Sequence, residues 1–332
     1  MIFVKAKRIM SNHQSKNEHA NSRNAGFSRL SPTLAFQLAA PHTWAAAIMP
    51  VLLSCVYCAV TYSPKLSISF ALILLLICIL MQSAVNVFND YFDFKKGTDT
   101  RENSSEDKFD AVLVYNRLNP RSVCLLGVGL LVIAGILGLY LVFLTSWILL
   151  VLGVIGALIV VLYSGGKTPI SYLPIGEFVS GFVMGGIIPL ACCYALSGVF
   201  DLFVLLISLP TMIGIGMILF TNNTCDIEKD IPAQRKTLSV VLGRERGPRV
   251  YRTMILAWIV VVAAIVGICF PAGTPITMIM VLAEFPVLRA IMSNPLTQQS
   301  RTTAMSQIVM LNVIMGVFYC LEIGSTHLIS WV

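Results

Sequence analysis

Charged residues are scarce in this chain. Only 12% of its 332 residues are Asp, Glu, Lys or Arg, and 57% are hydrophobic, whereas a soluble domain carries about 25% charged residues. A soluble fold could not bury this much apolar surface, so the lipid bilayer is the expected solvent. The net charge of +7 does not indicate a nucleic-acid partner, because the basic residues lie almost entirely on one side of the predicted membrane spans, as described below.

The sequence also lacks the usual signals of histidine catalysis, zinc binding and disulfide scaffolds. It has four histidines and nine cysteines, and eight of the cysteines lie in or beside apolar runs, where a thiol behaves as a small hydrophobe. Cys55 and Cys58 have the spacing of a redox or zinc pair, but their apolar setting offers no partner ligands. No Ser/His/Asp set is present, so these chemistries are not expected.

Residues 1–40 contain no apolar core with a cleavage site, which argues against a signal peptide. They are rich in Asn, Ser, Lys and Arg, a composition typical of disorder. We therefore expect a disordered cytoplasmic tail over 1–40 and a single transmembrane domain over 41–332.

Long apolar runs dominate the rest of the chain. A helix needs roughly 17–25 such residues to cross a bilayer, and these runs predict an all-α membrane bundle of about nine spans. Pro189 and Pro210 should kink their helices. The expected spans are about 44–62, 67–89, 122–143, 145–163, 175–196, 202–221, 251–270, 274–291 and 305–323.

Basic residues fall almost entirely on one side of these spans. The side that holds the N-terminal tail and the loops after the second, fourth, sixth and eighth spans carries 22 of the 23 Lys and Arg, and only Lys65 lies on the other side. Loops rich in Lys and Arg stay in the cytoplasm. The N-terminus and the two long acidic loops, 90–121 and 222–253, are therefore predicted to be cytoplasmic.

Two of the predicted spans end in similar acidic motifs. Successive members of each motif are three or four residues apart, and residues at these spacings share one face of a helix. Acids at a helix C-terminus are disfavoured by the helix dipole, so ordinary solvated helix ends are a poor explanation for a pattern that occurs twice. The repetition also suggests that the first four spans are duplicated in the next four. The motifs are Asn86, Asp90 and Asp93 after the second span and Asn222, Asp226 and Asp230 after the sixth.

Crowded carboxylates need a counter-charge, and Mg²⁺ is the natural one because it takes hard oxygen ligands and leaves positions for substrate phosphates. Two facing clusters would hold a diphosphate between their metal ions, which would neutralise the leaving group. The predicted catalytic and metal-binding residues are Asp90, Asp93, Asp226 and Asp230, with further positive charge from Lys108, Lys167, Arg235 and Lys236.

A third segment, 163–177, joins the fourth and fifth spans on the same side as the acidic motifs. It carries Tyr163, Lys167 and Tyr172 among Gly and Pro residues. Such a segment can be an interfacial aromatic anchor with a turn, but its location favours a role in lining the site.

These segments together resemble the UbiA superfamily of intramembrane aromatic prenyltransferases, over roughly residues 40–325. The paired Asn/Asp motifs are similar to the superfamily signature. The segments 41–51, 89–99, 163–177, 222–230 and 235–243 resemble the branch that prenylates 1,4-dihydroxy-2-naphthoate. The sequence departs from many members of that branch at Ala40, where they have Arg, and at Lys167, where they have Pro.

The resemblance implies a bundle with a central cavity in a bacterial plasma membrane, with no obligate protein partner. Its substrates would be a polyprenyl diphosphate, bound through Mg²⁺ with help from Asn86 and Asn222, and an aromatic acid. Prenylation of dihydroxynaphthoate with loss of CO₂ would give demethylmenaquinone. Another acceptor, such as 4-hydroxybenzoate or homogentisate, stays open, as does a transporter whose carboxylates coordinate a cation. Transporter sites usually lie near the bilayer midplane, whereas these acids end their helices.

Overall fold

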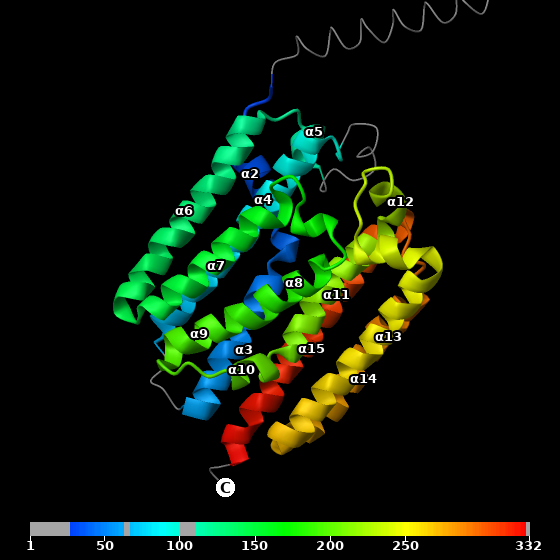
Figure 1. Ribbon diagram of the computed structural model, residues 1–332. Helices are drawn as coiled ribbons and strands as arrows, with labels where there is room; N and C mark the ends of the chain where they lie inside the picture. The colour runs from blue at the N-terminus through cyan, green and yellow to red at the C-terminus, as the bar shows by residue number, and fades with distance from the viewer. Residues whose placement is uncertain (1–26, 63–66, 100–110, 330–332) are drawn as a thin grey trace, which may run out of the picture.

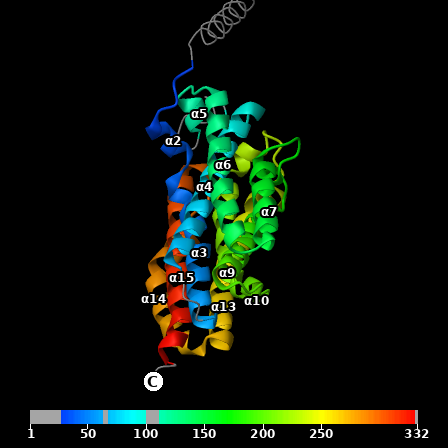
Figure 2. The ribbon, with the colours of Figure 1, turned by 90° about the vertical axis from the view of Figure 1, so that its left-hand side faces the viewer.

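The computed structural model describes residues 27–62, 67–99 and 111–329, and these residues form an elongated bundle of helices (Figures 1 and 2). No β-strand is present within them beyond an isolated bridge between Ser28 and Leu118. The predicted all-α fold is therefore confirmed for the described part of the chain. Residues 1–26, Lys65 and Lys108 lie outside it.

The helices alternate in direction along the chain, so that short connections join neighbours at each end of the bundle (Figure 1). The longer elements are α3 (Ala45–Tyr62), α4 (Ile68–Lys96), α6 (Pro120–Leu144), α7 (Trp147–Ser164), α8 (Gly176–Phe182), α9 (Ile188–Ser197), α11 (Leu209–Cys225), α13 (Leu238–Cys269), α14 (Thr274–Ser293) and α15 (Arg301–Ile329). The shorter ones are α2 (Pro32–Leu38), α5 (Val112–Tyr115), α10 (Phe203–Ile207) and α12 (Ile227–Asp230), with 3₁₀ turns at 41–43, 170–172, 271–273 and 298–300.

Eight helices in the described residues are long and apolar enough to cross a membrane, against the nine spans predicted. The difference lies at the predicted span 202–221, which divides into α10 and the 17-residue α11. The division falls at Ser208, just before Pro210, whose ring cannot continue a preceding helix. The α10–α11 pair still occupies the place of that span in the bundle (Figure 1).

The fifth predicted span, 175–196, is one continuous run from Gly176 to Ser197. A π-helical turn over Val183–Ile187 joins α8 to α9 directly ahead of Pro189. Proline removes a backbone donor, and an inserted π turn is a common way for a helix to accommodate such a break. In the same run, Gly181 and Gly185 pack against the backbone of α11 at Met212, where a Cβ would clash.

The tail boundary at residue 41 needs correction. Helix α2 begins with Pro32, is capped by the Ser31 side chain, and contacts α4 and α5. Leu38 of α2 is buried in a small core with Val87 of α4 and Leu113 of α5. Burial of these apolar side chains stabilises the segment, so the ordered part begins ahead of residue 41.

Both acidic motifs lie at the same end of the bundle, near α2, α5 and α12, and the C-terminus lies at the opposite end (Figure 1). The main core between the two ends is formed by α3, α11, α13 and α15, and includes the fully buried Tyr251 and Tyr319. Large apolar side chains such as Leu125, Phe143 and Trp147 are exposed on α6 and α7, as expected for surfaces that face lipid. The internal repeat of the first four spans in the next four stays a prediction.

Candidate active site

The first acidic motif lies on an uninterrupted helix. Helix α4 continues through Asn86, Asp90 and Asp93 to Lys96 and ends at Gly97, which adopts φ 74° as a left-handed C-cap. The Asn86 amide donates to the backbone oxygen of Ala39 at 3.0 Å and to the Thr43 hydroxyl at 2.8 Å. These bonds tie α4 to the turn before α3.

Asp90 is 8% exposed and accepts a hydrogen bond from the backbone N–H of Leu113 at 3.3 Å. That amide lies in the first turn of α5, where backbone donors have no partner within the helix. Helix α5 thus contacts one of the predicted metal ligands.

The second motif contains a break. Helix α11 ends at Cys225, and Asp226 leaves helical geometry with φ −99° and ψ 12° before α12 begins. Arg301, the first residue of α15, donates from Nη2 to the Asn222 side-chain oxygen at 2.6 Å and pairs through Nε with Asp226 at 3.0 Å. Asn222 and Asp226 therefore face one direction, as the spacing predicted.

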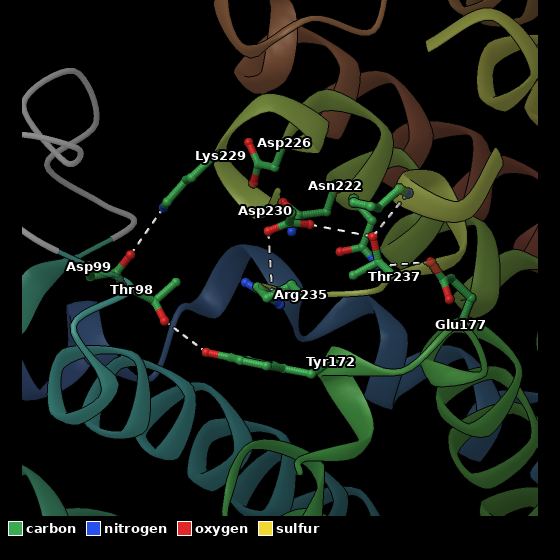
Figure 3. Close-up of polar contacts among 12 residues, drawn as sticks. Thr98, Asp99, Tyr172, Glu177, Asn222, Asp226, Lys229, Asp230, Arg235 and Thr237 are labelled. Carbon is green, nitrogen blue, oxygen red and sulfur yellow. Dashed lines mark hydrogen bonds and ion pairs between the residues drawn. The ribbon is translucent and has the colours of Figure 1, made fainter. Parts of the chain in front are cut away.

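Asp230, the last residue of α12, contacts the loop that follows it. Asp230 is 1% exposed; its carboxylate lies 3.4 Å from Nε of Arg235 and accepts the Thr237 hydroxyl at 3.5 Å (Figure 3). Burial raises the pKa of Asp230 to about 6; the Arg235 charge opposes this rise, and the charges of Asp226 and Asp93 add to it.

The two motifs meet in one charged cluster, which we define as Asp93, Asp99, Lys229, Asp230 and Arg235. Asp93 of α4 and Asp230 of α12 lie close enough for each charge to act on the other. Lys229 of α12 pairs with Asp99, just after α4, at 3.0 Å (Figure 3). This ion pair joins residues that lie 130 positions apart in the sequence.

The third predicted segment contributes two tyrosines to this region. The Tyr172 hydroxyl hydrogen-bonds with Thr98 at 2.7 Å, and its ring lies 4.6 Å from Lys96 Nζ and 5.0 Å from Arg235 Cζ. Such cation–π contacts hold a cation in place without using its hydrogen-bond donors. Tyr163 is buried, and the charges of Asp93 and Arg235 act on its hydroxyl group.

Two predicted basic residues are placed differently. Lys167 is exposed, and no contact joins it to the charged cluster within the described part of the chain. The Lys236 side chain is also exposed, although its backbone N–H donates to the Tyr172 carbonyl at 2.9 Å. Lys236 therefore fixes the loop beside Arg235 through its main chain.

Sequence reasoning missed several residues of the site. Arg301 entered it only as a charge that set topology, yet it contacts Asn222 and Asp226. Glu177 accepts a hydrogen bond from Asn223 at 2.8 Å, which links α8 to the second motif. The available signal for Arg301 was its position ahead of the last span, at the acidic end of the bundle.

The predicted metal ligands supply hard carboxylate oxygens, the donors that Mg²⁺ prefers. Within the described residues, no three His, Cys, Asp or Glu side chains lie close enough together to enclose a metal ion by themselves. Arg301 and Arg235 hold Asp226 and Asp230 in that arrangement. The chemistry of the donor set fits a Mg²⁺ ion completed by phosphate oxygens and water.

A pocket lies between α3, α11, α13 and α15. Its lining is mostly apolar and includes Met49, Ile215, Trp258 and Met315, with the Asn312 amide as a polar member. Asn312 donates to the backbone oxygens of Gly214 and Ile308.

Comparison with known proteins places this arrangement in a family. The model of the UbiA prenyltransferase family matches residues 47–314. The chain is 34% identical over 231 residues to the 1,4-dihydroxy-2-naphthoate octaprenyltransferase of Bacillus subtilis, covering 68% of this chain and 73% of that protein. It is 30% identical to UbiA prenyltransferase domain-containing protein 1 of Danio rerio, covering 84% and 80%.

Solved structures share the fold. A UbiA homolog from Archaeoglobus fulgidus, bound to GPP and Mg²⁺, aligns with a TM-score of 0.61 at 14% identity over 87% of this chain and 99% of that one. The family model covers well over half of the chain, and the eight apolar helices match a membrane fold. This multi-pass membrane protein belongs to the UbiA prenyltransferase family.

Proposed function

We propose that this protein transfers a polyprenyl group from polyprenyl diphosphate to 1,4-dihydroxy-2-naphthoate, with loss of CO₂, to give demethylmenaquinone. The observation that carries the proposal is the charged cluster, in which acids from two separate helix ends meet the guanidinium of Arg235. Similarity to dihydroxynaphthoate octaprenyltransferases of Bacillus subtilis and Mycobacterium tuberculosis supports this acceptor.

In this proposal Asp90, Asp93, Asp226 and Asp230 hold Mg²⁺, which supplies charge neutralisation for the departing diphosphate. Asn86 and Asn222 orient the two acidic motifs, because each makes side-chain hydrogen bonds beside its aspartates. Arg235, Arg301 and Lys229 bring fixed positive charge to the phosphate oxygens. Tyr163 lines the site, and the exposed Lys167 and Lys236 lie at its rim.

The reaction needs a dry, apolar space for the prenyl chain. As the C–O bond to diphosphate breaks, the allylic carbon becomes cationic, and water would quench it. The pocket between α3, α11, α13 and α15 supplies apolar walls. The electron-rich ring attacks through its carboxyl-bearing carbon; a C–C bond forms, and CO₂ leaves with the ring regaining aromaticity.

The membrane orientation belongs to the same proposal. The acidic end of the bundle faces the cytoplasm of a plasma membrane, because the excess of Lys and Arg lies at that end. One transmembrane domain, beginning with α2, carries the site. Neither a nucleic acid nor an obligate protein partner is needed for this function.

The test uses membranes that contain the full chain, a labelled polyprenyl diphosphate and three acceptors offered separately: dihydroxynaphthoate, 4-hydroxybenzoate and homogentisate. We expect a labelled, decarboxylated product from dihydroxynaphthoate alone, lost on chelation and restored by Mg²⁺. Membranes carrying Asp226→Asn with Asp230→Asn are the matched control. Prenylation of another acceptor would overturn the assignment of dihydroxynaphthoate as the acceptor. Turnover after full chelation would overturn the requirement for Mg²⁺. The absence of product from every acceptor would overturn the assignment of prenyltransferase activity.

A further inference from the structure

A second group of buried acids lies far from the charged cluster. Helices α14 and α15 lie side by side (Figures 1 and 2) and carry Glu284 and Glu322, both 0% exposed. Glu322 lies 21 residues beyond Arg301 on α15, about 30 Å along the helix at 1.5 Å per residue. These acids are therefore separate from the proposed diphosphate site.

The oxygens of this group have no hydrogen-bond partner among the residues that the structure describes. Both carboxyl oxygens of Glu284, both of Glu322 and the hydroxyl of Thr277 are buried and unsatisfied. Native structures rarely leave buried polar atoms in this state, and each one indicates a role or a bound species. Five such atoms on two adjacent helices therefore point to a ligand that they share.

Helix geometry brings the three side chains together. Thr277 and Glu284 are seven residues apart, two turns along one face of α14, and both belong to its buried stripe. The charge of Glu322 acts on Glu284 across the helix interface. The Thr277 hydroxyl, 9% exposed, lies close enough to act on Glu322 without reaching hydrogen-bond geometry.

Among the described residues, no Lys or Arg side chain pairs with these acids. Burial and the charge of Glu322 act on Glu284, and burial and Thr277 act on Glu322. The charge of Glu322 acts in turn on Tyr319 and Cys320 of α15, neither of which is a cation.

An isolated ionised carboxylate inside a membrane bundle is very costly, and such a group neutralises instead. A proton is the smallest ligand that removes the charge and turns one oxygen into a donor. We propose that Glu284, Glu322 and Thr277 form a membrane-embedded proton-binding site, in which the carboxyl pair is protonated at neutral pH. Deprotonation of both acids would set two like charges against each other across the α14–α15 interface.

The test is infrared spectroscopy of the purified full-length protein in lipid nanodiscs. A protonated carboxylic acid has a carbonyl stretch that a carboxylate lacks, so we expect this band at neutral pH, shifted in D₂O and removed in the Glu284→Gln, Glu322→Gln double variant. Asp201→Asn is the matched control. Asp201 lies at the same end, accepts hydrogen bonds from Tyr57 and Tyr62, and should leave the band unchanged.

Labelling the unmodified protein with ¹³C-glutamate gives a readout that does not depend on folding of the variants. A glutamate-specific protonated band at neutral pH, with or without sodium, supports the proposal. Absence of that band overturns it. A band seen in N-methylglucamine buffer but lost on adding NaCl also overturns it, because an alkali cation would then occupy the site in place of the proton.

Discussion

The two acidic helix ends have similar sequences but are built differently. The α4 end is an unbroken helix whose Asn86 and Asp90 bond to backbone and hydroxyl groups of nearby segments. The α11 end breaks at Asp226, and its acids pair with Arg301 and Arg235 from two other parts of the chain. The first end is positioned by its own helix and the second by tertiary ion pairs.

Two helix ends with similar sequences can therefore be held in place by different kinds of contact. Removing Arg301 should weaken the second end and spare the first, whereas removing an aspartate should damage either. The five predictions below follow this comparison, from the largest expected effect to the smallest.

Loss of one aspartate from either end should have the largest effect. We expect Asp93→Asn and Asp230→Asn each to lower prenyl transfer by at least about 100-fold, the scale of removing one preorganised electrostatic group. Turnover with saturating Mg²⁺ measures this, and Asp201→Asn at the opposite end is the control. A tenfold difference between the two variants would show that the ends do not contribute equally, and near-normal activity in both would reject their assignment.

Arg301→Lys should reduce activity by about 10–100-fold. Lysine carries its charge on a single nitrogen. It cannot reproduce the planar guanidinium of Arg301, which hydrogen-bonds to Asn222 and pairs with Asp226 at the same time. The loss should appear mainly as a higher KM for the diphosphate. Arg289→Lys is the matched control, because Arg289 is exposed on α14. Equal kinetics in the two variants would contradict the role of Arg301.

Arg235→Gln should move the pH profile. The ordinary pKa of an aspartate is 3.8, and burial raises that of Asp230 to about 6 although the Arg235 charge opposes the rise. Removing Arg235 should raise this pKa further, so the acidic limb of the activity profile should shift to higher pH. Lys236→Gln should leave the limb in place. If the acidic limb of the pH–activity profile does not move in the Arg235→Gln variant, the ionisation of Asp230 does not determine that limb.

The same pKa fixes the sign of a stability effect. Because the folded pKa lies above the unfolded one, ionising Asp230 costs the folded protein stability as the pH rises from about 4 to about 6. Asp230→Asn should therefore lose less thermal stability than the unmodified protein across this window. The reverse order would contradict the raised pKa.

Lys167→Ala should have the smallest effect, less than about twofold on turnover, since its exposed side chain makes no contact with the charged cluster in the described structure. Surface substitutions away from such contacts usually change little. A loss of tenfold or more would place Lys167 on a substrate that reaches the rim of the site.

Local patterns predicted much of the site. The i, i+4 spacing of Asn222 and Asp226 correctly placed both on one face, as their shared partner Arg301 shows. The spacing from Asp226 to Asp230 stays a prediction. The Asp230 N–H still donates to the Asp226 carbonyl at 2.8 Å, and the charge of Asp226 acts on Asp230, although Asp226 itself leaves helical geometry and Asp230 pairs with Arg235. The sequence spacing did not predict this local break.

Sequence alone determined the membrane class, the approximate spans and the sharing of one end by both acidic motifs, because hydropathy, span length and charge asymmetry are local or additive properties. Only the tertiary structure decided which cations hold which acids, which lysines stay outside the charged cluster, and that Glu284 and Glu322 are buried against each other. These pairings join residues distant in sequence, and their geometry depends on how whole helices pack. The sequence pattern alone therefore does not reveal these pairings.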